Sequence, residues 1–165
     1  MADTLTKEQR SHTMRSVKGK NTKPELLVRS VLHSLGFRFR LNRKDLPGKP
    51  DIVLPKYKTV IFVHGCFWHR HKGCKHATMP ASNQNYWKPK FERTIERDRE
   101  NERRLRAQGW LVCTLWECEV RKDAFLAVTN GLVETGLLDD DATLLCANAL
   151  RNDTLRMNSA KTLLP

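Results

Sequence analysis

The sequence predicts an α/β domain with a mixed central sheet flanked by helices. Patterns typical of helices and of short buried strands alternate along the chain, in the order helix, strand, strand, strand, helix, strand. The chain has 165 residues, which is enough for one domain with a hydrophobic core and terminal extensions. We therefore expect one active unit.

Two capping boxes predict helices in the N-terminal part of the chain. Thr6 and Gln9 form the first, which opens a short helix. Thr22 and Glu25 form a clearer one, and the apolar stripe that follows it ends at Gly36. A third, long and highly charged helix is predicted over residues 89–108, and residues 121–135 and 142–151 show weaker helical patterns.

Four short runs have the composition of strands. The first alternates apolar and basic side chains, and the others are mostly apolar: residues 37–41, 51–54, 59–64 and 110–116. None of these runs is long enough to cross a bilayer, and we expect no membrane role. The start of the chain has no apolar core behind its charges, so we expect a cytoplasmic protein.

The charge of the chain predicts a polyanionic partner. Its formal net charge is +12, and residues 1–122 carry 27 basic against 12 acidic side chains, whereas residues 123–165 carry 3 against 6. Basic side chains gain affinity for nucleic acid by displacing counterions from phosphates. Nucleic acid is therefore the expected partner, although Lys and Arg can also simply solvate a small surface.

The cysteines and histidines predict a metal site. Five cysteines without a secretory signal make a disulfide framework improbable. Zinc in structural sites takes four thiolate or imidazole ligands. Three lie within nine residues, and a fourth can return from the end of a later strand, which gives the set Cys66, His71, Cys74 and Cys118. Cys113 and His76 compete for the fourth position.

Two carboxylates are candidates for a second metal. Asp51 begins a predicted strand and Glu25 lies on the preceding helix. Mg²⁺ prefers oxygen ligands, and phosphodiester cleavage needs such ligands beside the scissile phosphate. Both residues also have a simpler explanation, because Pro-Asp is common in turns and Glu25 completes a capping box.

Four motifs resemble the very short patch repair endonucleases. They are LPGKPD at 46–51, VIFVHGCFWH at 60–69, ERD at 96–98, and GW with WEC between 109 and 118. The resemblance covers about residues 5–122. It implies a restriction-endonuclease-like fold with a structural zinc, Mg²⁺ dependence, and nicking of double-stranded DNA beside a T·G mispair that arises from deamination of 5-methylcytosine.

The resemblance also implies the domain organisation and cellular setting. Residues 1–122 would form the endonuclease domain with an N-terminal DNA-binding helix, and residues 123–165 a C-terminal helical extension of unknown role. The protein would act as a monomer at the bacterial nucleoid, together with other repair proteins.

Residue roles follow from the same resemblance. Asp51 and the backbone carbonyl of Val63 would bind Mg²⁺, His69 would act as general base or acid, and Asp98 would orient it. Glu25 and His64 would hold water or phosphate beside the metal. The residues themselves support one of these roles, because Asp98 lies on the apolar stripe of its helix and needs a partner. That partner is His69, or a neighbouring arginine such as Arg97 or Arg99.

The resemblance further implies an aromatic wedge that enters the base stack at the mispair. Phe67, Trp68 and Trp87 would enter from one side, and Met14, with Val17 beside it, from the other. Without the resemblance, these aromatics would be expected in the core.

This sequence departs from the family pattern at two points. Val63 stands where related nucleases often carry a polar residue, so only its carbonyl could reach a metal. Two residues separate His71 from Cys74, which alters the geometry of the loop.

Two other functions remain open. One is a restriction or nicking endonuclease that recognises a sequence without a mispair. The other is a zinc-containing DNA-binding module without catalysis.

Overall fold

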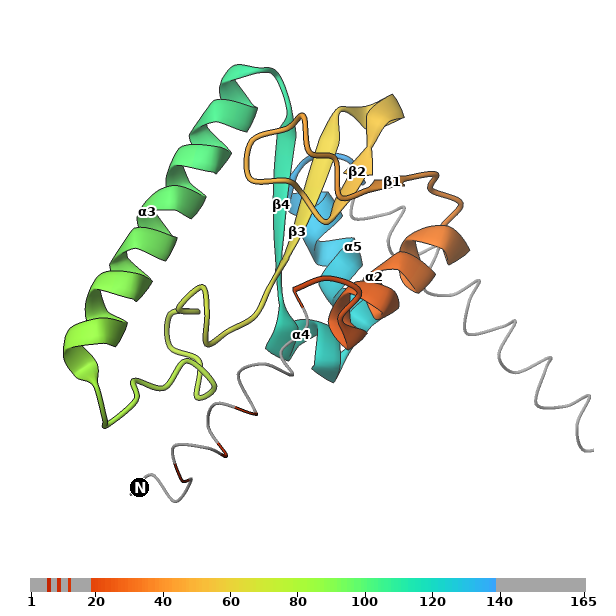
Figure 1. Cartoon of the computed structure of the whole chain (residues 1–165). Coiled ribbons are helices and arrows are strands. Elements are labelled where there is room, and N and C mark those ends of the chain that lie inside the picture. The colour runs from red at the N-terminus through yellow and green to blue at the C-terminus, as the bar shows by residue number, and fades with distance from the viewer. Residues whose placement is uncertain (1–5, 7–8, 10–11, 13–18, 139–165) are drawn as a thin grey trace, which may run out of the picture.

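The computed structural model describes residues 6, 9, 12 and 19–138 (Figure 1). Its elements follow in the order α2 (Lys23–Ser34), β1 (Arg40–Leu41), β2 (Ile52–Leu54), the short 3-10 helix η1 (Pro55–Tyr57), β3 (Thr59–His64), α3 (Gln84–Ala107), β4 (Leu111–Trp116), α4 (Glu117–Lys122) and α5 (Ala124–Glu134). No helix in these ranges is long and apolar enough to cross a membrane.

The four strands form one mixed sheet, as predicted, and their order in the sheet is β1-β2-β3-β4. β2 is antiparallel to β1 and β3, whereas β3 and β4 are parallel and pair in register from Thr59 with Leu111 to His64 with Trp116. The chain crosses between β3 and β4 through α3, as a parallel connection requires.

Helices cover both faces of the sheet. α3 lies alone on one side in Figure 1, and α2 and α5 lie on the other. Successive side chains along each strand point to opposite faces of the sheet, so the core has two parts. Val53, Val60 and Val112 pack with Leu105 of α3 on one face. The buried residues next to them along each strand pack on the other face, against α2 and α5. Both faces are therefore dry, which explains why the central strands are almost continuously apolar.

Three segments differ from the prediction. Only Arg40–Leu41 of the expected strand 37–41 pairs, because Phe37 turns into the core before the strand starts. α3 begins at Gln84 rather than at residue 89 and contains Pro89 inside the helix, just after its first turn, where the missing N–H removes one intrahelical hydrogen bond. Helical structure continues from α4 through α5, with a break at Asp123.

α5 belongs to the same core as the rest of the fold. Val128 and Leu132 are fully buried in the larger core cluster, together with Val28 and Leu32 of α2. This helix lies beyond residue 122, where the endonuclease domain was expected to end. Met14, Val17 and residues 142–151 are outside the described residues.

Candidate active site and candidate metal centre

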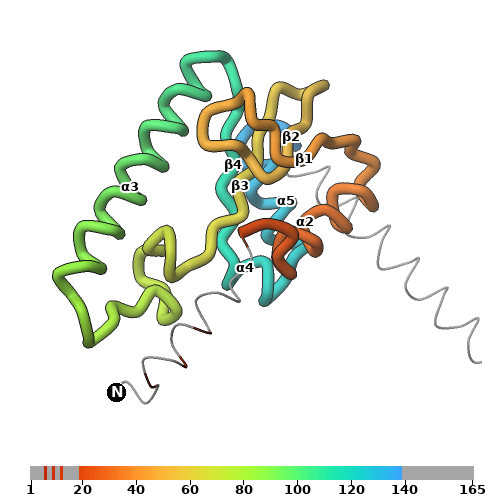
Figure 2. The backbone as a smooth tube through the Cα atoms, in the orientation of Figure 1, coloured from red at the N-terminus to blue at the C-terminus, as the bar shows by residue number. Residues whose placement is uncertain are grey.

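Strand directions bring the predicted functional residues to one end of the sheet. β2 is antiparallel to β3, so the start of β2 lies beside the end of β3, and β4 ends there as well because it is parallel to β3. Asp51 precedes β2, His64 ends β3, and Cys118 follows β4. The loop 65–83, which carries the HGCFWH motif, lies between this end of the sheet and the start of α3 (Figure 2).

Asp51 is held at this end of the sheet by the neighbouring strand. Its Oδ2 accepts a hydrogen bond of 2.9 Å from the backbone N–H of Val63. Burial raises the pKa of Asp51 to about 6, with a further increase from the negative charge of Glu25. The Val63 N–H and the positive charges of Arg29 and His69 act in the opposite direction. A carboxylate kept in so unfavourable an environment is a good ligand for a divalent cation.

Glu25 has two roles in the structure. It completes the capping box of α2 with Thr22, as its position in the sequence predicts, and it is 4% exposed. It also lies close enough to Asp51 to affect the pKa of that residue. The capping explanation and the site explanation of Glu25 are therefore compatible.

His69 and Asp98 form the closest polar contact of the site. His69 Nδ1 and Asp98 Oδ2 are 2.5 Å apart, and Asp98 Oδ1 accepts a second hydrogen bond from Arg97 at 3.2 Å. Burial raises the pKa of Asp98, but the hydrogen bond from His69 and its charge outweigh that effect, and the net pKa is lowered. Asp98 thus has both partners that the sequence left open, His69 and an arginine.

His64 stacks on His69. Their ring centroids are 3.7 Å apart with planes at 7°. Burial, followed by the charge of His69, lowers the pKa of His64 to about 3, so this imidazole is neutral at physiological pH. The side chains of His64, His69 and Asp98 are close enough together to be considered as a metal site. Because the two imidazoles are stacked, their lone pairs lie in nearly parallel planes, an arrangement poorly suited to binding one ion between the rings.

These residues line one cleft of about 1300 Å³. Glu25, Asp51, His64, His69 and Asp98 all face it. Basic side chains from the loop after β1, from α2, α3 and α4 line the same cleft: Lys23, Lys44, Lys49, Arg97, Arg99, Arg106 and Arg121. Arg106 and Arg121 are paired with Glu102 and Glu117. The remaining cations can attract a phosphodiester backbone to the cleft.

An aromatic cluster stands beside the cleft. We use this name for Phe67, Trp68, Trp87 and Phe91, whose adjacent rings are 5.0–6.2 Å apart. Phe91 is buried in the fold, whereas Phe67, Trp68 and Trp87 are only half-buried, and Trp68 lines the cleft. Lys90 lies over the rings of Trp68 and Trp87. The three predicted wedge residues are therefore gathered in one place.

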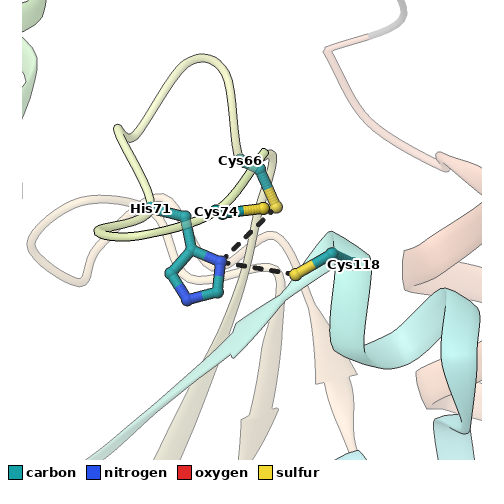
Figure 3. Close-up of side chains that lie close together, drawn as sticks. All are labelled: Cys66, His71, Cys74 and Cys118. Carbon is teal, nitrogen blue, oxygen red and sulfur yellow. Dashed lines mark hydrogen bonds between the residues drawn. The ribbon is translucent and has the colours of Figure 1, made fainter. Parts of the chain in front are cut away.

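The predicted metal ligands converge from two segments (Figure 3). Cys66, His71 and Cys74 come from the loop after β3, and Cys118 comes from the start of α4. Their ligand atoms all lie within 4.8 Å of one another. His71 Nδ1 is 3.7 Å from Cys66 Sγ and 3.3 Å from Cys118 Sγ, close to the ~3.5 Å that tetrahedral ligation by sulfur and nitrogen gives. The four residues can hold a metal ion.

Neither competing ligand joins this group. Cys113 is buried in the core on β4, where burial raises its pKa to about 12. His76 is exposed, and its backbone N–H lowers the pKa of the Cys74 thiol. A hydrogen bond of this kind stabilises a thiolate and thus supports Cys74 as a ligand.

Two residues near these sites were not identified from the sequence. Trp116 stacks on His71, with ring centroids 4.1 Å apart and planes at 2°. Arg29 pairs with Glu25 at 2.9 Å in a largely buried contact. The spacing of Glu25 and Arg29, four positions apart on a predicted helix, was the available signal for the second of these.

Comparison with known proteins agrees with the geometry. The family model described as DNA mismatch endonuclease Vsr matches residues 2–76. The chain is 53% identical over 120 residues to the type II nicking enzyme V.XorIIP of Xanthomonas oryzae pv. oryzae (strain KACC10331 / KXO85), which covers 73% of this chain and 88% of that protein.

Two further relatives match a similar share of the chain. The type II nicking enzyme V.NmeAIP of Neisseria meningitidis serogroup A / serotype 4A (strain DSM 15465 / Z2491) is 48% identical over 75% of this chain and 88% of its own length. The DNA mismatch endonuclease Vsr of Escherichia coli (strain K12) is 41% identical over 73% of this chain and 77% of its own length. Because identity at this level extends over most of each relative, this chain belongs to the DNA mismatch endonuclease Vsr family.

Proposed function

We propose that this protein nicks one strand of duplex DNA beside a T·G mispair, by Mg²⁺-dependent hydrolysis that leaves a 5′-phosphate and a 3′-hydroxyl. The observation that carries the proposal is a juxtaposition in one cleft. Asp51 and the His69–Asp98 pair face the same space as Trp68 of the aromatic cluster. Chemistry and base-stack recognition could thus act on the same nucleotide step.

The side chains divide the chemistry between them. Asp51 and the backbone carbonyl of Val63 would hold Mg²⁺ beside the scissile phosphate. The ion, when bound, offsets the negative charge that develops on the phosphate oxygens. Asp98 keeps the Nδ1–H of His69 directed toward itself, which leaves Nε2 free to accept a proton from the attacking water.

The reaction is a displacement at phosphorus. The water oxygen forms a bond to phosphorus while its proton passes to His69, and the bond from phosphorus to the 3′ oxygen breaks. The 3′ oxygen takes up a proton from solvent, and His69 later returns its proton to solvent. His64 is neutral and stacked on His69, and it can donate a hydrogen bond to the phosphate. A water molecule bound by Glu25 can donate a second one. Its neutral state also avoids a second positive charge that would hinder proton uptake by His69.

The aromatic cluster supports recognition of a mispair. Insertion of side chains into the base stack requires unstacking energy of a few kcal/mol per step, and a mispair lowers that requirement. Phe67, Trp68 and Trp87 are half-buried, so they retain surface that can contact bases. Met14 would enter from the opposite side of the duplex.

We also propose that Cys66, His71, Cys74 and Cys118 bind zinc. Thiolate ligands favour zinc over magnesium, and a set of three thiols with one imidazole is typical of closed structural sites. The two metals would therefore occupy separate sites.

A second candidate function keeps the chemistry and changes the recognition. Several relatives are named type II nicking enzymes, which supports a nicking endonuclease that recognises a sequence without requiring a mispair. Matched and mispaired duplexes of one sequence distinguish the two candidates.

The test combines substrate and protein variants. We expect nicking of a T·G duplex with Mg²⁺, none with EDTA, and binding that favours T·G over C·G by ~1–3 kcal/mol. Phe67→Ala combined with Trp68→Ala should remove this preference, whereas Tyr86→Ala, which removes an exposed aromatic of α3, should retain it. Equal nicking of C·G and T·G by the unmodified protein would favour sequence recognition, and a double variant that kept its preference would place these aromatics in the core.

A further inference from the structure

Arg29 is a largely buried cation behind the carboxylates of the cleft. Its side chain is 12% exposed and that of its partner Glu25 is 5% exposed. The guanidinium uses both terminal nitrogens: Nη2 donates to Glu25 Oε2 at 2.9 Å, and Nη1 donates to Asn21 Oδ1 at 2.8 Å. Its Nε is buried without a hydrogen-bond partner among the described residues.

Stability alone does not account for this arrangement. A buried donor without a partner costs ~1–3 kcal/mol. A buried ion pair is often no better for stability than well-packed apolar side chains of similar size. If residue 29 of α2 served only for packing, an apolar side chain would therefore suit this position as well as arginine does.

The hydrogen bonds of Glu25 show what Arg29 does. Oε1 accepts from the Thr22 hydroxyl at 2.8 Å and from the Thr22 backbone N–H at 3.3 Å. Oε2 accepts from the Asn21 backbone N–H at 2.9 Å and from Arg29. Each carboxylate oxygen thus has two donors, and the group is fixed in position and orientation.

Asn21 links this carboxylate to the chain that precedes α2. Its backbone has a φ of 54°, a left-handed conformation that asparagine tolerates better than most residues. Arg29 binds the side chain of Asn21, and Glu25 binds its backbone. One guanidinium therefore fixes both the carboxylate and the turn that leads into the helix.

The charge of Arg29 also acts on the neighbouring carboxylate. Arg29 is ion-paired at 2.9 Å with Glu25, and Glu25 and Asp51 line the same cleft. The two carboxylates of the cleft therefore have one fixed cation next to them, and its charge acts on Asp51 in the opposite direction to that of Glu25. That cation offsets part of the negative charge that would otherwise attract a divalent ion.

We propose that Arg29 is a positioning residue of the active site, which holds Glu25 in place against Asn21 and limits the affinity of the two carboxylates for a divalent cation. The inference rests on the proposed function, in which Asp51 binds that cation. Arginine is required for the positioning part, because its planar guanidinium can reach two acceptors at once and a lysine ammonium on this helix can replace only one of those contacts.

The variants separate charge from position. Arg29→Met keeps the length of the side chain and removes both effects, Arg29→Lys keeps the charge, and Asn21→Gly keeps the left-handed backbone and removes the second acceptor. Arg103→Met is the matched control, because it removes the same charge from an exposed ion pair with Glu100 on α3. All four are made in the full chain, and melting temperature and zinc content are recorded for each.

Two measurements are made on each variant. Binding of Mn²⁺ without DNA is followed by calorimetry, and single-turnover nicking of a T·G duplex is followed at saturating protein and Mg²⁺. In Arg29→Met we expect Mn²⁺ to bind ~3–10-fold more tightly, because an opposing charge is lost. We expect its nicking rate to fall ~10-fold or more, because Glu25 is no longer fixed. A general loss of structure would weaken metal binding and slow nicking together, so tighter metal binding combined with slower nicking would exclude it.

The other variants should divide this result. Arg29→Lys is expected to keep the Mn²⁺ affinity of the unmodified protein and to nick more slowly. Asn21→Gly should behave in the same way, and it keeps the test valid if Arg29→Met does not fold. The proposal would be overturned if both Arg29 variants had the same Mn²⁺ affinity and nicking rate as Arg103→Met. It would also be overturned if a lower melting temperature were the only change in the Arg29 variants.

The metal measurement is independent of the nicking substrate. If the unmodified protein fails to nick T·G duplexes, the proposed function fails, whereas a difference in Mn²⁺ affinity between Arg29→Met and Arg103→Met still supports the role of Arg29. Identical Mn²⁺ affinities in those two variants would exclude the effect of its charge.

Discussion

Asp51 illustrates at the scale of one residue how function and stability conflict. It is half-buried, and the Val63 N–H together with the positive charges of Arg29 and His69 only partly compensates for the loss of hydration of its carboxylate. The pKa in the folded protein, about 6, lies above the ordinary value of 3.8. Folding is therefore favoured when Asp51 is protonated, and this stability is lost as the pH rises through 6.

We predict that Asp51→Asn abolishes nicking and stabilises the metal-free protein. At pH 8 in EDTA the free energy of unfolding should rise by ~1–3 kcal/mol, because the charge is removed and the amide oxygen can still accept from Val63. Thermal unfolding of both proteins checks this. The gain should shrink as the pH falls through 6 and disappear only below the ordinary pKa of 3.8, where the carboxyl is protonated in both the folded and the unfolded chain. A gain that did not shrink with pH would contradict the explanation.

His64 contributes to stability with the opposite pH dependence, and its contribution has to be separated from that of Asp51. Its folded pKa of about 3 lies below the ordinary 6.5, so the unfolded chain binds a proton between these values and stability falls as the pH decreases below 6.5. This contribution is present in both proteins. It therefore cancels in the difference between Asp51→Asn and the unmodified chain.

At the scale of elements, the loop 65–83 has almost no regular structure of its own. Its form depends on short turns and on contacts of Arg70, which donates to the Thr78 carbonyl and lies over the ring of Phe91. The other fixed point is the Cys/His group that joins the loop to α4 (Figure 3). The loop carries His69, Phe67 and Trp68, so this link also helps to fix the positions of these side chains.

We predict one tightly bound zinc per chain, and loss of it in Cys118→Ser. The variant should also melt at a lower temperature and nick more slowly, because structural zinc sites contribute directly to folding. Cys113→Ala is the control, since that thiol lies in the core and not in the Cys/His group. Elemental analysis and thermal unfolding test both variants, and full zinc retention in Cys118→Ser would remove it from the ligand set.

At the scale of the whole molecule, the protein has the restriction-endonuclease-like fold of its family, with a mixed sheet between two helical layers (Figure 1). α5 completes one of these layers. Gly131 on this helix lies so close to β4 that an added Cβ would be 2.6 Å from Leu115 Cδ2 and 2.7 Å from Cys113 Sγ. Such contact requires a residue without a side chain.

We predict that Gly131→Ala destabilises the whole nuclease core by ~1–3 kcal/mol, because overpacking exceeds the gain in helix propensity. Asn130→Ala, an exposed change at the adjacent position, should have little effect. Denaturant unfolding followed by tryptophan fluorescence and by circular dichroism should shift together in Gly131→Ala. An unchanged midpoint would mean that α5 is not part of the cooperative core.

The sequence by itself determined the class of fold, the order of the main elements and most members of the candidate site. Capping boxes and apolar runs located α2, β2, β3 and β4, because these signals are local. The residues themselves indicated Asp51 and the group Cys66, His71, Cys74 and Cys118 as candidates, because their types suit metal ligation, and the resemblance to the family added His69.

Only the tertiary structure decided which of these residues meet. Three features depend on strand direction and on the path of the loop. They are the hydrogen bonds of Asp98 with His69 and Arg97, the stacking of His64 on His69, and the place of Cys118 rather than Cys113 in the metal-ligand group. The same holds for the burial of Arg29 and for the place of α5 in the core. A local pattern fixes the face on which a side chain lies, but contacts between distant segments depend on how the faces pack, and that is a property of the whole chain.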